Sequence, residues 1–359
     1  MMHCSLHCYS NSGHISNLLT GYALLRQAGA VTLSQQCLIG NAFNASKPQH
    51  LRDARLAHLL IVVNGSVKLF YDNHDSYEID GDMAEGVDFY FKRSYSRPRI
   101  PDSIASKVFP LGLNYPLYPD SIDALECERL QAFAEGFSSP YSPFNQSIPS
   151  LFRPTPANMH SAPAEDLNAK VLFMTRVCDP FDHKERSDEK ARARIRMNET
   201  RASCVEALRR EFGDDFLGGF ERTDYAVKNY GEFVWDDDEI SLKGNYIKLL
   251  GAYPICVSTE GHHRSVCWKL GEYVAFSKAI VSERLCYQIP GDFEEGRNYL
   301  GFDNTDECVD AVRKLFTDKG LRDQIMKNNY AYYNEYVEPK NMIQRTLTIG
   351  MSGRRAACS

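Results

Sequence analysis

The sequence predicts an α/β protein of two domains, each built around a largely parallel β-sheet. Its 359 residues are enough for two domains of ordinary size. Residues 255–282 read as an apolar strand, a polar loop, an amphipathic helix and a second strand, a unit that joins parallel strands through a right-handed crossover. A segment rich in proline and serine, 138–165, separates the two halves. We therefore expect domains at 1–137 and 166–349, a linker or insertion between them, and a loose tail at 350–359.

The composition is that of a folded protein and argues against a nucleic-acid partner. Hydrophobic residues make up 43% of the chain and charged residues 25%, which suits a globular core. The net charge of -6 lacks the basic excess that binding to nucleic acid requires. No apolar run reaches the roughly 20 residues of a membrane helix, and the first residues, MMHCSLHCYSNSGH, do not read as a signal peptide.

The cysteines and histidines do not predict a metal site. Eleven cysteines without a CxxC pair fit reduced thiols, and we expect a cytoplasmic protein. His3, Cys4, His7 and Cys8 are close in sequence, but no second ligand pair follows at zinc spacing, so we expect no metal.

A polar cluster follows a predicted hairpin in the first domain. The strands 59–63 and 67–71 are joined by Asn64-Gly65, a strong hairpin signal, and Asp72, His74 and Asp75 come directly after them. Two carboxylates and an imidazole are costly to bury unpaired, so they should face a ligand or one another. An ordinary hydrogen-bonded turn is the competing interpretation.

Other polar residues also stand where predicted strands end or helices begin. Gly13 and His14 precede a helix at 15–28, either as a ligand loop or as a helix cap. Arg176 follows the strand 170–175, and its guanidinium suits the oxygens of a phosphate. The charged stretch 183–201 reads as the solvated face of a helix, whose cations contribute little.

The loop within 255–282 is the best candidate for a reaction site. Gly261, His262, His263, Arg264 and Ser265 lie between a strand and a helix, where free backbone N–H groups attract phosphate. The competing interpretation is a structural glycine loop with a solvated Lys269–Glu272 pair on the helix.

This stretch carries a resemblance. The run EG, a helix ending in GEYVA and the strand SKAIVSE are similar to the nucleotide-sugar site of group 1 glycosyltransferases of the GT-B fold. The resemblance implies two Rossmann-like domains facing across a cleft, with a nucleotide-sugar as co-substrate and no other cofactor. In this family the helix glutamate bonds the ribose, which implies that role for Glu272. Arg264 stands where the family has a further glutamate, and it is counted as a catalytic candidate that would stabilise the leaving diphosphate together with Arg176.

The resemblance also implies roles for other residues. The loop before the helix faces the diphosphate and donor sugar, so Gly261, His262, His263 and Ser265 would bind the donor. Arg176 matches an arginine that holds the diphosphate. Residues Gly13 and His14 would face donor phosphate and acceptor.

In the first domain, His74 matches a histidine that contacts the donor sugar. Asp75 and Asp72 stand beside it in the chain and are counted with it as catalytic candidates.

The activity that these expectations describe is glycosyl transfer to a glycan, a lipid-linked or a small-molecule acceptor, with retention and without a metal, in polysaccharide assembly and in contact with the inner membrane face. An inverting enzyme would instead need a general base, for which Asp72, His74 and Asp75 are the candidates. A nucleotide-sugar epimerase and a non-catalytic nucleotide-sugar or glycan-binding protein are the alternatives.

Overall fold

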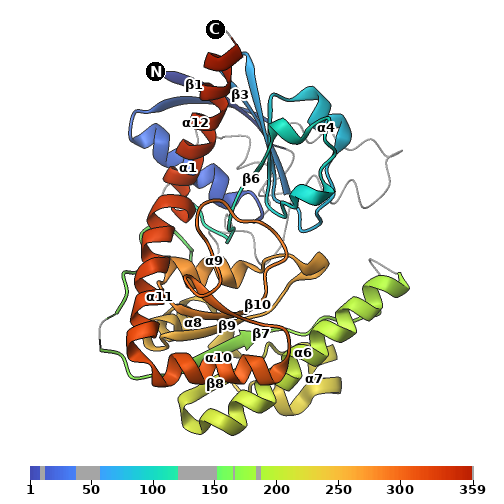
Figure 1. Ribbon diagram of the computed structural model, residues 1–359, viewed down its shortest axis with the longest axis vertical. Helices are drawn as coiled ribbons and strands as arrows, with labels where there is room; N and C mark the ends of the chain where they lie inside the picture. Colours follow the sequence, from blue (N-terminus) through green and yellow to red (C-terminus); the bar gives the residue numbers. More distant parts are fainter. Residues whose placement is uncertain (9–12, 38–56, 120–151, 165, 183–186, 358–359) are drawn as a thin grey trace. The chain divides into compact units, whose positions relative to one another are not determined.

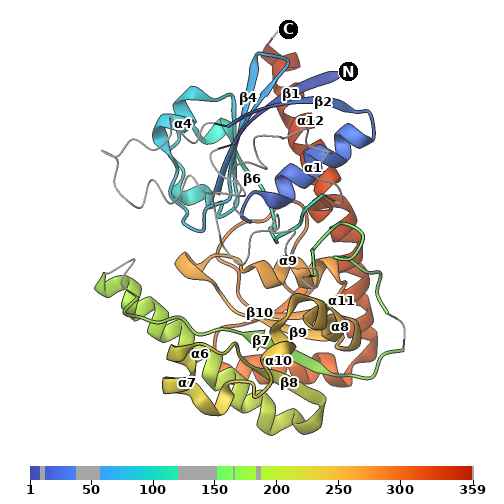
Figure 2. The same ribbon diagram turned by 180° about the vertical axis from the view of Figure 1, so that it is seen from behind.

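The protein forms two α/β units, shown from opposite sides in Figures 1 and 2. The computed structural model describes residues 1–8, 13–37, 57–119, 152–164, 166–182 and 187–357. Unit 1 comprises Met1–Met159, Tyr287–Gly291 and Asn334–Ser359, and unit 2 comprises His160–Cys286 and Asp292–Tyr333.

The C-terminal end of the chain differs from the prediction. Residues 334–349 group with unit 1 and not with the second domain. The predicted tail is helical as far as residue 357, because helix α12 (Pro339–Ala357) continues through it. The side chain of Thr346, on this helix, lies 2.7 Å from the Tyr71 hydroxyl of the unit 1 sheet. Of the predicted linker, 138–151 and 165 lie outside the described residues, as do residues 120–137 of the predicted first domain.

Unit 1 contains a six-stranded sheet in the order β2-β1-β3-β4-β5-β6. Its strands are β1 (Met2–Cys8), β2 (Val31–Cys37), β3 (His58–Val63), β4 (Val67–Asp72), β5 (Phe89–Lys92) and β6 (Val108–Pro110). Strand β3 is antiparallel to both of its neighbours, and the other pairs are parallel. The predicted hairpin is confirmed, with Asn64 at φ 50° and Gly65 at φ 68°, as a two-residue hairpin turn requires. The ends of β1, β4, β5 and β6 therefore meet at one edge of the sheet.

Two hydrophobic clusters lie in the part of unit 1 that the structure describes. One lies where α1 (Ser16–Gln27) and α12 pack, and the other includes Ala84 of the short helix α4 (Gly81–Gly86). The contact between α1 and α12 is very close at Gly21, because a Cβ atom there would lie 2.3 Å from the carbonyl oxygen of Pro339. A glycine is required at that point for the two helices to touch.

Unit 2 contains a fully parallel five-stranded sheet in the order β11-β10-β9-β7-β8. Its strands are β7 (Val171–Thr175), β8 (Phe216–Phe220), β9 (Ile255–Ser258), β10 (Ala279–Glu283) and β11 (Tyr299–Phe302). The chain moves outward from β7 to β8, then returns to the other side of β7 with β9. The direction of strand order thus reverses between β7 and β9, and ligands of open α/β sheets bind outside the carboxyl ends at such a point.

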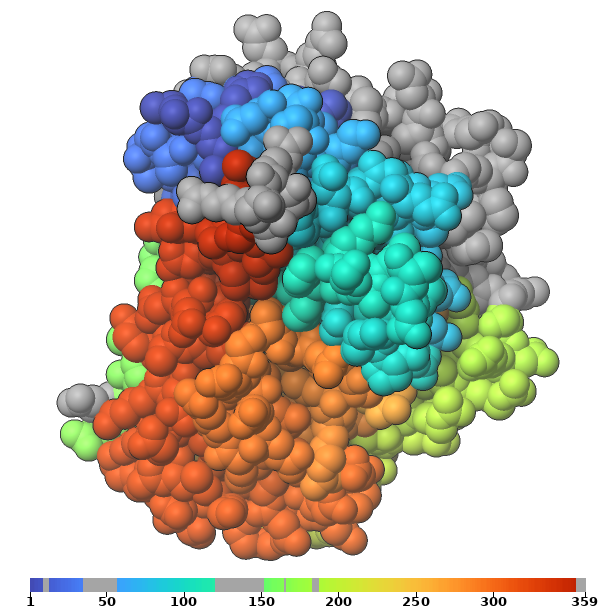
Figure 3. Space-filling model, turned by 45° about the horizontal axis from the view of Figure 1, so that its top comes forward, coloured from blue at the N-terminus to red at the C-terminus, as the bar shows by residue number. Residues whose placement is uncertain are grey.

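Helices cover both faces of this sheet. They are α6 (Asp188–Phe212), α7 (Asp224–Tyr230), α8 (Lys243–Ala252), α9 (Trp268–Ala275), α10 (Thr305–Thr317) and α11 (Lys319–Tyr332). Helices α6 and α10 lie on one face and α9 on the other (Figures 1 and 2). Ser187 begins α6 by accepting a hydrogen bond from the Lys190 N–H group, and the first half of this helix reaches the surface of unit 2 (Figure 3, yellow-green). The sequence patterns did not predict strand β11.

Gly21→Ala should destabilise unit 1, because the added methyl group overlaps a backbone oxygen that cannot move without shifting α12. Overpacking of this kind costs about 1–3 kcal/mol. We expect a lower thermal unfolding midpoint in calorimetry. The matched control is Gly251→Ala in α8, where the new methyl group meets no atom within 4 Å, so that stability should stay equal or rise slightly. Equal midpoints for the two variants would contradict the close helix contact.

Candidate functional site

The loops that follow β7 and β9 are joined by one buried side chain, Arg201 of α6. Its Nε donates to Thr259 Oγ1 at 2.9 Å, and its two terminal nitrogens donate to the carbonyl oxygens of Arg176 at 2.6 Å and Glu260 at 2.8 Å. Arg176 directly follows β7, while Thr259 and Glu260 directly follow β9. One guanidinium thus fixes both loops at the point where the strand order reverses.

Two further residues of α6 hold the loop after β7. Asn198 both donates to and accepts from the backbone of Cys178, at 2.8 and 2.9 Å, and Arg194 donates to the carbonyl oxygen of Asp179 at 3.0 Å. Arg194, Asn198 and Arg201 are spaced at i, i+4 and i+7, so they lie on one face of the helix. The interpretation of this part of α6 as a wholly solvated face is therefore wrong: these three polar side chains are buried and position the loop.

The loop after β9 is compact. Gly261 N–H donates to the Ser265 carbonyl oxygen at 2.8 Å, and Ser265 N–H donates to that of His262 at 3.0 Å. A Cβ atom on Gly261 would lie 2.8 Å from Ser265 Oγ. His263 and Arg264 both adopt positive φ, near 60°, a conformation that costs about 1–3 kcal/mol for residues other than glycine and often occurs at ligand sites.

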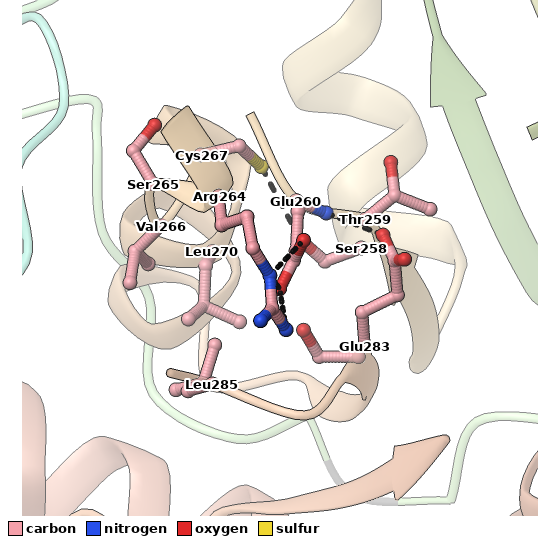
Figure 4. A pocket seen from close by; sticks show the side chains of 11 residues that line it. Ser258, Thr259, Glu260, Arg264, Ser265, Val266, Cys267, Leu270, Glu283 and Leu285 are labelled. Carbon is pink, nitrogen blue, oxygen red and sulfur yellow. Dashed lines mark hydrogen bonds and ion pairs between the residues drawn. The ribbon is translucent and has the colours of Figure 1, made fainter. Parts of the chain in front are cut away.

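A small pocket lies beside this loop (Figure 4). Arg264 points to Glu260, and its Nε lies 2.9 and 3.0 Å from the two carboxylate oxygens. Glu283, at the end of β10, accepts the Glu260 N–H group at 2.6 Å, and burial raises the pKa of the Glu283 carboxyl. The pocket volume of about 10 Å³ is enough for about one water molecule, and both charged and apolar side chains line it.

Arg176 presents a charge to solvent. Its residue is exposed, while its carbonyl oxygen is held by Arg201. Within the described part of the chain, the Arg176 guanidinium makes no hydrogen bond or ion pair. The predicted phosphate-binding residue is therefore placed at the switch point of the sheet with its side chain available.

Glu272 lies in a buried charge cluster on α9. It is 4% exposed and forms an ion pair with Lys243, the first residue of α8. Lys269 stands over the Tyr246 ring at 4.1 Å. Burial opposes the charged form of Glu272, but Lys243 and Lys269 outweigh it and hold the pKa of the carboxyl below its usual value. Glu272 is thus an ionised acceptor fixed by α8, and not the solvated residue of the competing interpretation.

In unit 1 the predicted polar residues also come together. Asn73 and Asn114, after β4 and β6, donate to the His14 carbonyl oxygen at 2.6 and 3.2 Å. Asp75 accepts from the buried Arg93 at 2.5 Å. Burial, opposed by the charge of Asp75, lowers the pKa of the half-buried His14 imidazole to about 4.

His74 is half-buried too, and burial lowers the pKa of its imidazole. Both histidines are therefore neutral at pH 7, and the Asp75 charge is balanced by Arg93. Gly13 is half-buried at the start of the same turn.

Asp72 is enclosed in the unit 1 core. Its carboxylate accepts hydrogen bonds from Tyr90 at 2.5 Å and Lys92 at 2.8 Å, and His58 Nε2 lies 3.4 Å away. Asp72 and Lys92 are 2% and 1% exposed. Burial opposes the charge on Asp72, but Lys92 and His58 hold its pKa far below the usual range. These contacts give Asp72 a structural role, which the sequence prediction of a catalytic carboxylate did not distinguish.

Sequence reasoning missed Arg201 as a part of these sites. A buried arginine in a helix full of surface charges has no local signal, although the i, i+4, i+7 spacing of Arg194, Asn198 and Arg201 was readable. Among the described residues, no group of three or more His, Cys, Asp or Glu side chains is placed to hold a metal ion, and no helix is long and apolar enough to cross a membrane.

The sequence matches no known family model and no curated protein. Among solved structures, it is similar to Anabaena HepE in complex with UDP-glucose, with 10% identity, a TM-score of 0.45, and 98% of this chain and 100% of that chain covered. The C-terminal domain of a group 1 glycosyl transferase from Francisella tularensis has 15% sequence identity and a TM-score of 0.34, and the match covers 49% of this chain and 94% of that chain. UDP-GlcNAc 2-epimerase from Neisseria meningitidis has 14% sequence identity and a TM-score of 0.37, and the match covers 74% of this chain and 62% of that chain. Similarities at this level do not identify an activity of this chain.

Asp72→Asn should strongly destabilise unit 1, because it leaves Lys92 buried without its counter-charge, a loss of about 3–5 kcal/mol. The double variant Asp72→Asn/Lys92→Met should be more stable than Asp72→Asn alone, since neither buried charge remains. The depressed pKa of Asp72 also adds stability that is complete above about pH 4 and is lost as pH falls, so the double variant should show a weaker acid dependence. Urea unfolding at pH 7 and pH 3.5 measures both effects, and additive losses would contradict the pairing.

Proposed function

We propose that this chain is a glycosyltransferase that moves a sugar from a nucleotide-sugar donor to a hydroxyl-bearing acceptor. The observation that carries the proposal is the exposed Arg176 guanidinium, which stands at the switch point of the unit 2 sheet beside the loop 259–265. The Arg176 side chain is exposed while Arg201 holds its backbone, so its guanidinium is available to bind the oxygens of a diphosphate. The motif resemblance of the following helix, with Glu272, supports the same function.

The reaction needs the negative charge on the departing nucleoside diphosphate to be stabilised. Glycosyl transfer passes through an oxocarbenium-like state while that charge grows. Arg176 supplies a positive charge, and Arg264 supplies a second when it exchanges Glu260 for the phosphate. No metal takes part in this proposal, because the cations of unit 2 perform the neutralisation.

Glu272 binds the ribose of the donor in this proposal. An ionised carboxylate accepts hydrogen bonds from two neighbouring hydroxyl groups, and Lys243 keeps it ionised. Since Lys243 is the first residue of α8, the position of that helix is coupled to nucleotide binding.

Unit 1 binds the acceptor, a glycan, lipid-linked or small molecule. The neutral imidazoles of His14 and His74 can donate and accept hydrogen bonds with hydroxyl groups, and Asp75 is held ready by Arg93. We propose a retaining outcome, in which no strong base is required. Should the reaction invert, Asp75 or His74 becomes the general base, since Asp72 is enclosed.

A panel of nucleotide-sugars, incubated with the pure protein, tests the activity. The proposal predicts thermal stabilisation by one donor, and release of its nucleoside diphosphate that accelerates when an acceptor is added. An epimerase would convert the donor to a new sugar without any acceptor. A binding protein would be stabilised and release nothing, and either of these results would refute the proposal.

Arg176→Ala should lower turnover about 10²–10³-fold, by analogy with the loss of one group that stabilises charge in a transition state. Because Arg176 is exposed and no described residue depends on its side chain, folding should be unaffected. Arg313→Ala, which removes an exposed arginine of α10, is the matched control and should keep full activity. A wild-type rate for Arg176→Ala would remove this residue from the site.

His74→Ala should reduce transfer at least tenfold while leaving nucleoside diphosphate affinity unchanged, because the residue lies in unit 1 and the nucleotide is bound by unit 2. Turnover and calorimetric titration measure the two quantities separately. Equal losses of both would place His74 in the nucleotide site, and a lowered melting temperature with normal activity per folded molecule would make it a structural residue.

A further inference from the structure

Arg201 is buried without a counter-charge. The residue is 6% exposed, and all three of its hydrogen-bond acceptors are neutral oxygens, those of Thr259, Arg176 and Glu260. Within the described residues it forms no ion pair. Buried charges in proteins are ordinarily paired, because desolvation costs several kcal/mol per ion. A buried guanidinium that satisfies only carbonyl and hydroxyl oxygens therefore needs an explanation.

Its neighbours do not remove this charge. Glu283 is a carboxylate that acts on Arg201 through space, but the two side chains form no ion pair, and one Glu283 oxygen accepts the Glu260 N–H group. Burial lowers the pKa of the Arg201 guanidinium, although arginine remains charged at pH 7. The positive charge thus stays next to the backbone of Arg176 and Glu260, the residues that follow β7 and β9.

We propose that Arg201 is a positioning residue for a diphosphate-bearing ligand. It fixes the loops after β7 and β9 relative to each other and adds a buried positive charge next to them. This inference rests on the proposed function, because it places the phosphates of the nucleotide-sugar at this switch point. The phosphates of the ligand would add negative charge near this guanidinium, in addition to that of Glu283.

The two parts of this role follow from different contacts. The bonds to the carbonyl oxygens of Arg176 and Glu260 set where the Arg176 side chain and the Gly261 turn begin. The positive charge of Arg201 attracts the phosphates of the ligand but not its neutral parts. Because this charge is buried, salt screens it less than the exposed charge of Arg176.

The experiment compares Arg201→Met with Arg322→Met by calorimetric titration of inorganic pyrophosphate, the common nucleoside diphosphates and their nucleosides. Arg322 of α11 is the matched control because it is 5% exposed and also donates to backbone carbonyl oxygens of unit 2, those of Leu315 at 2.9 Å and Phe316 at 3.2 Å, which lie outside the loops after β7 and β9. Arg201→Met should weaken nucleoside diphosphate binding about tenfold and leave nucleoside binding unchanged. Arg322→Met should lower the melting temperature but change the diphosphate Kd less than about twofold.

The dependence of binding on salt distinguishes the contribution of Arg176 from that of Arg201. At 0.5 M NaCl the effect of Arg176→Met should shrink, whereas that of Arg201→Met should persist. If Arg201→Met does not fold, Arg201→Lys decides, because lysine keeps the charge but cannot reach three oxygens at once. It should bind the diphosphate about threefold more weakly than the wild type, with unchanged nucleoside affinity.

Two results would overturn the inference. If the wild type binds a nucleoside diphosphate and either Arg201 variant keeps the wild-type ratio of diphosphate to nucleoside affinity, Arg201 is structural and the proposed function stands. If the wild type binds neither pyrophosphate nor any nucleoside diphosphate, the proposed function fails and this inference fails with it.

Discussion

Three hydrogen bonds from one buried guanidinium join the loops on which the unit 2 site depends. Arg201 reaches from α6 to the residues that end β7 and β9, the two neighbouring strands at which the order of the sheet reverses. Asn198 holds the loop after β7 and Glu283 holds the loop after β9, whereas Arg201 contacts both loops at once. The loop conformation, with two residues at positive φ, is stable because its surroundings fix both ends.

The two units treat charge in different ways at their strand ends. In unit 1 the charge of Asp72 is matched by Lys92 and that of Asp75 by Arg93, and the imidazoles of His14 and His74 are neutral. In unit 2 the cations Arg176 and Arg201 have no carboxylate partner among the described residues. This difference supports a division of labour, in which unit 2 binds an anionic group and unit 1 binds hydroxyl groups.

Local patterns predicted much of the fold. The Asn64-Gly65 hairpin and the crossover from β9 through α9 to β10 follow from turn chemistry and hydrophobic periodicity, and both are confirmed. The same patterns placed Arg176 and His74 at strand ends. They did not predict that β3 pairs with β1, or that α12 packs on unit 1, because these depend on contacts distant in sequence. Whether Arg201 or Asp72 is buried likewise depends on which face of the element meets its neighbours.

The position of a bound nucleoside diphosphate tests the central claim most directly. A crystal structure of the chain with the nucleoside diphosphate that stabilises it most should show phosphate oxygens about 2.7–3.1 Å from the Arg176 guanidinium, at the carboxyl ends of β7 and β9. Arg201 should keep its three bonds beneath them. Phosphates bound elsewhere on the chain, with Arg176 still pointing into solvent, would contradict the account.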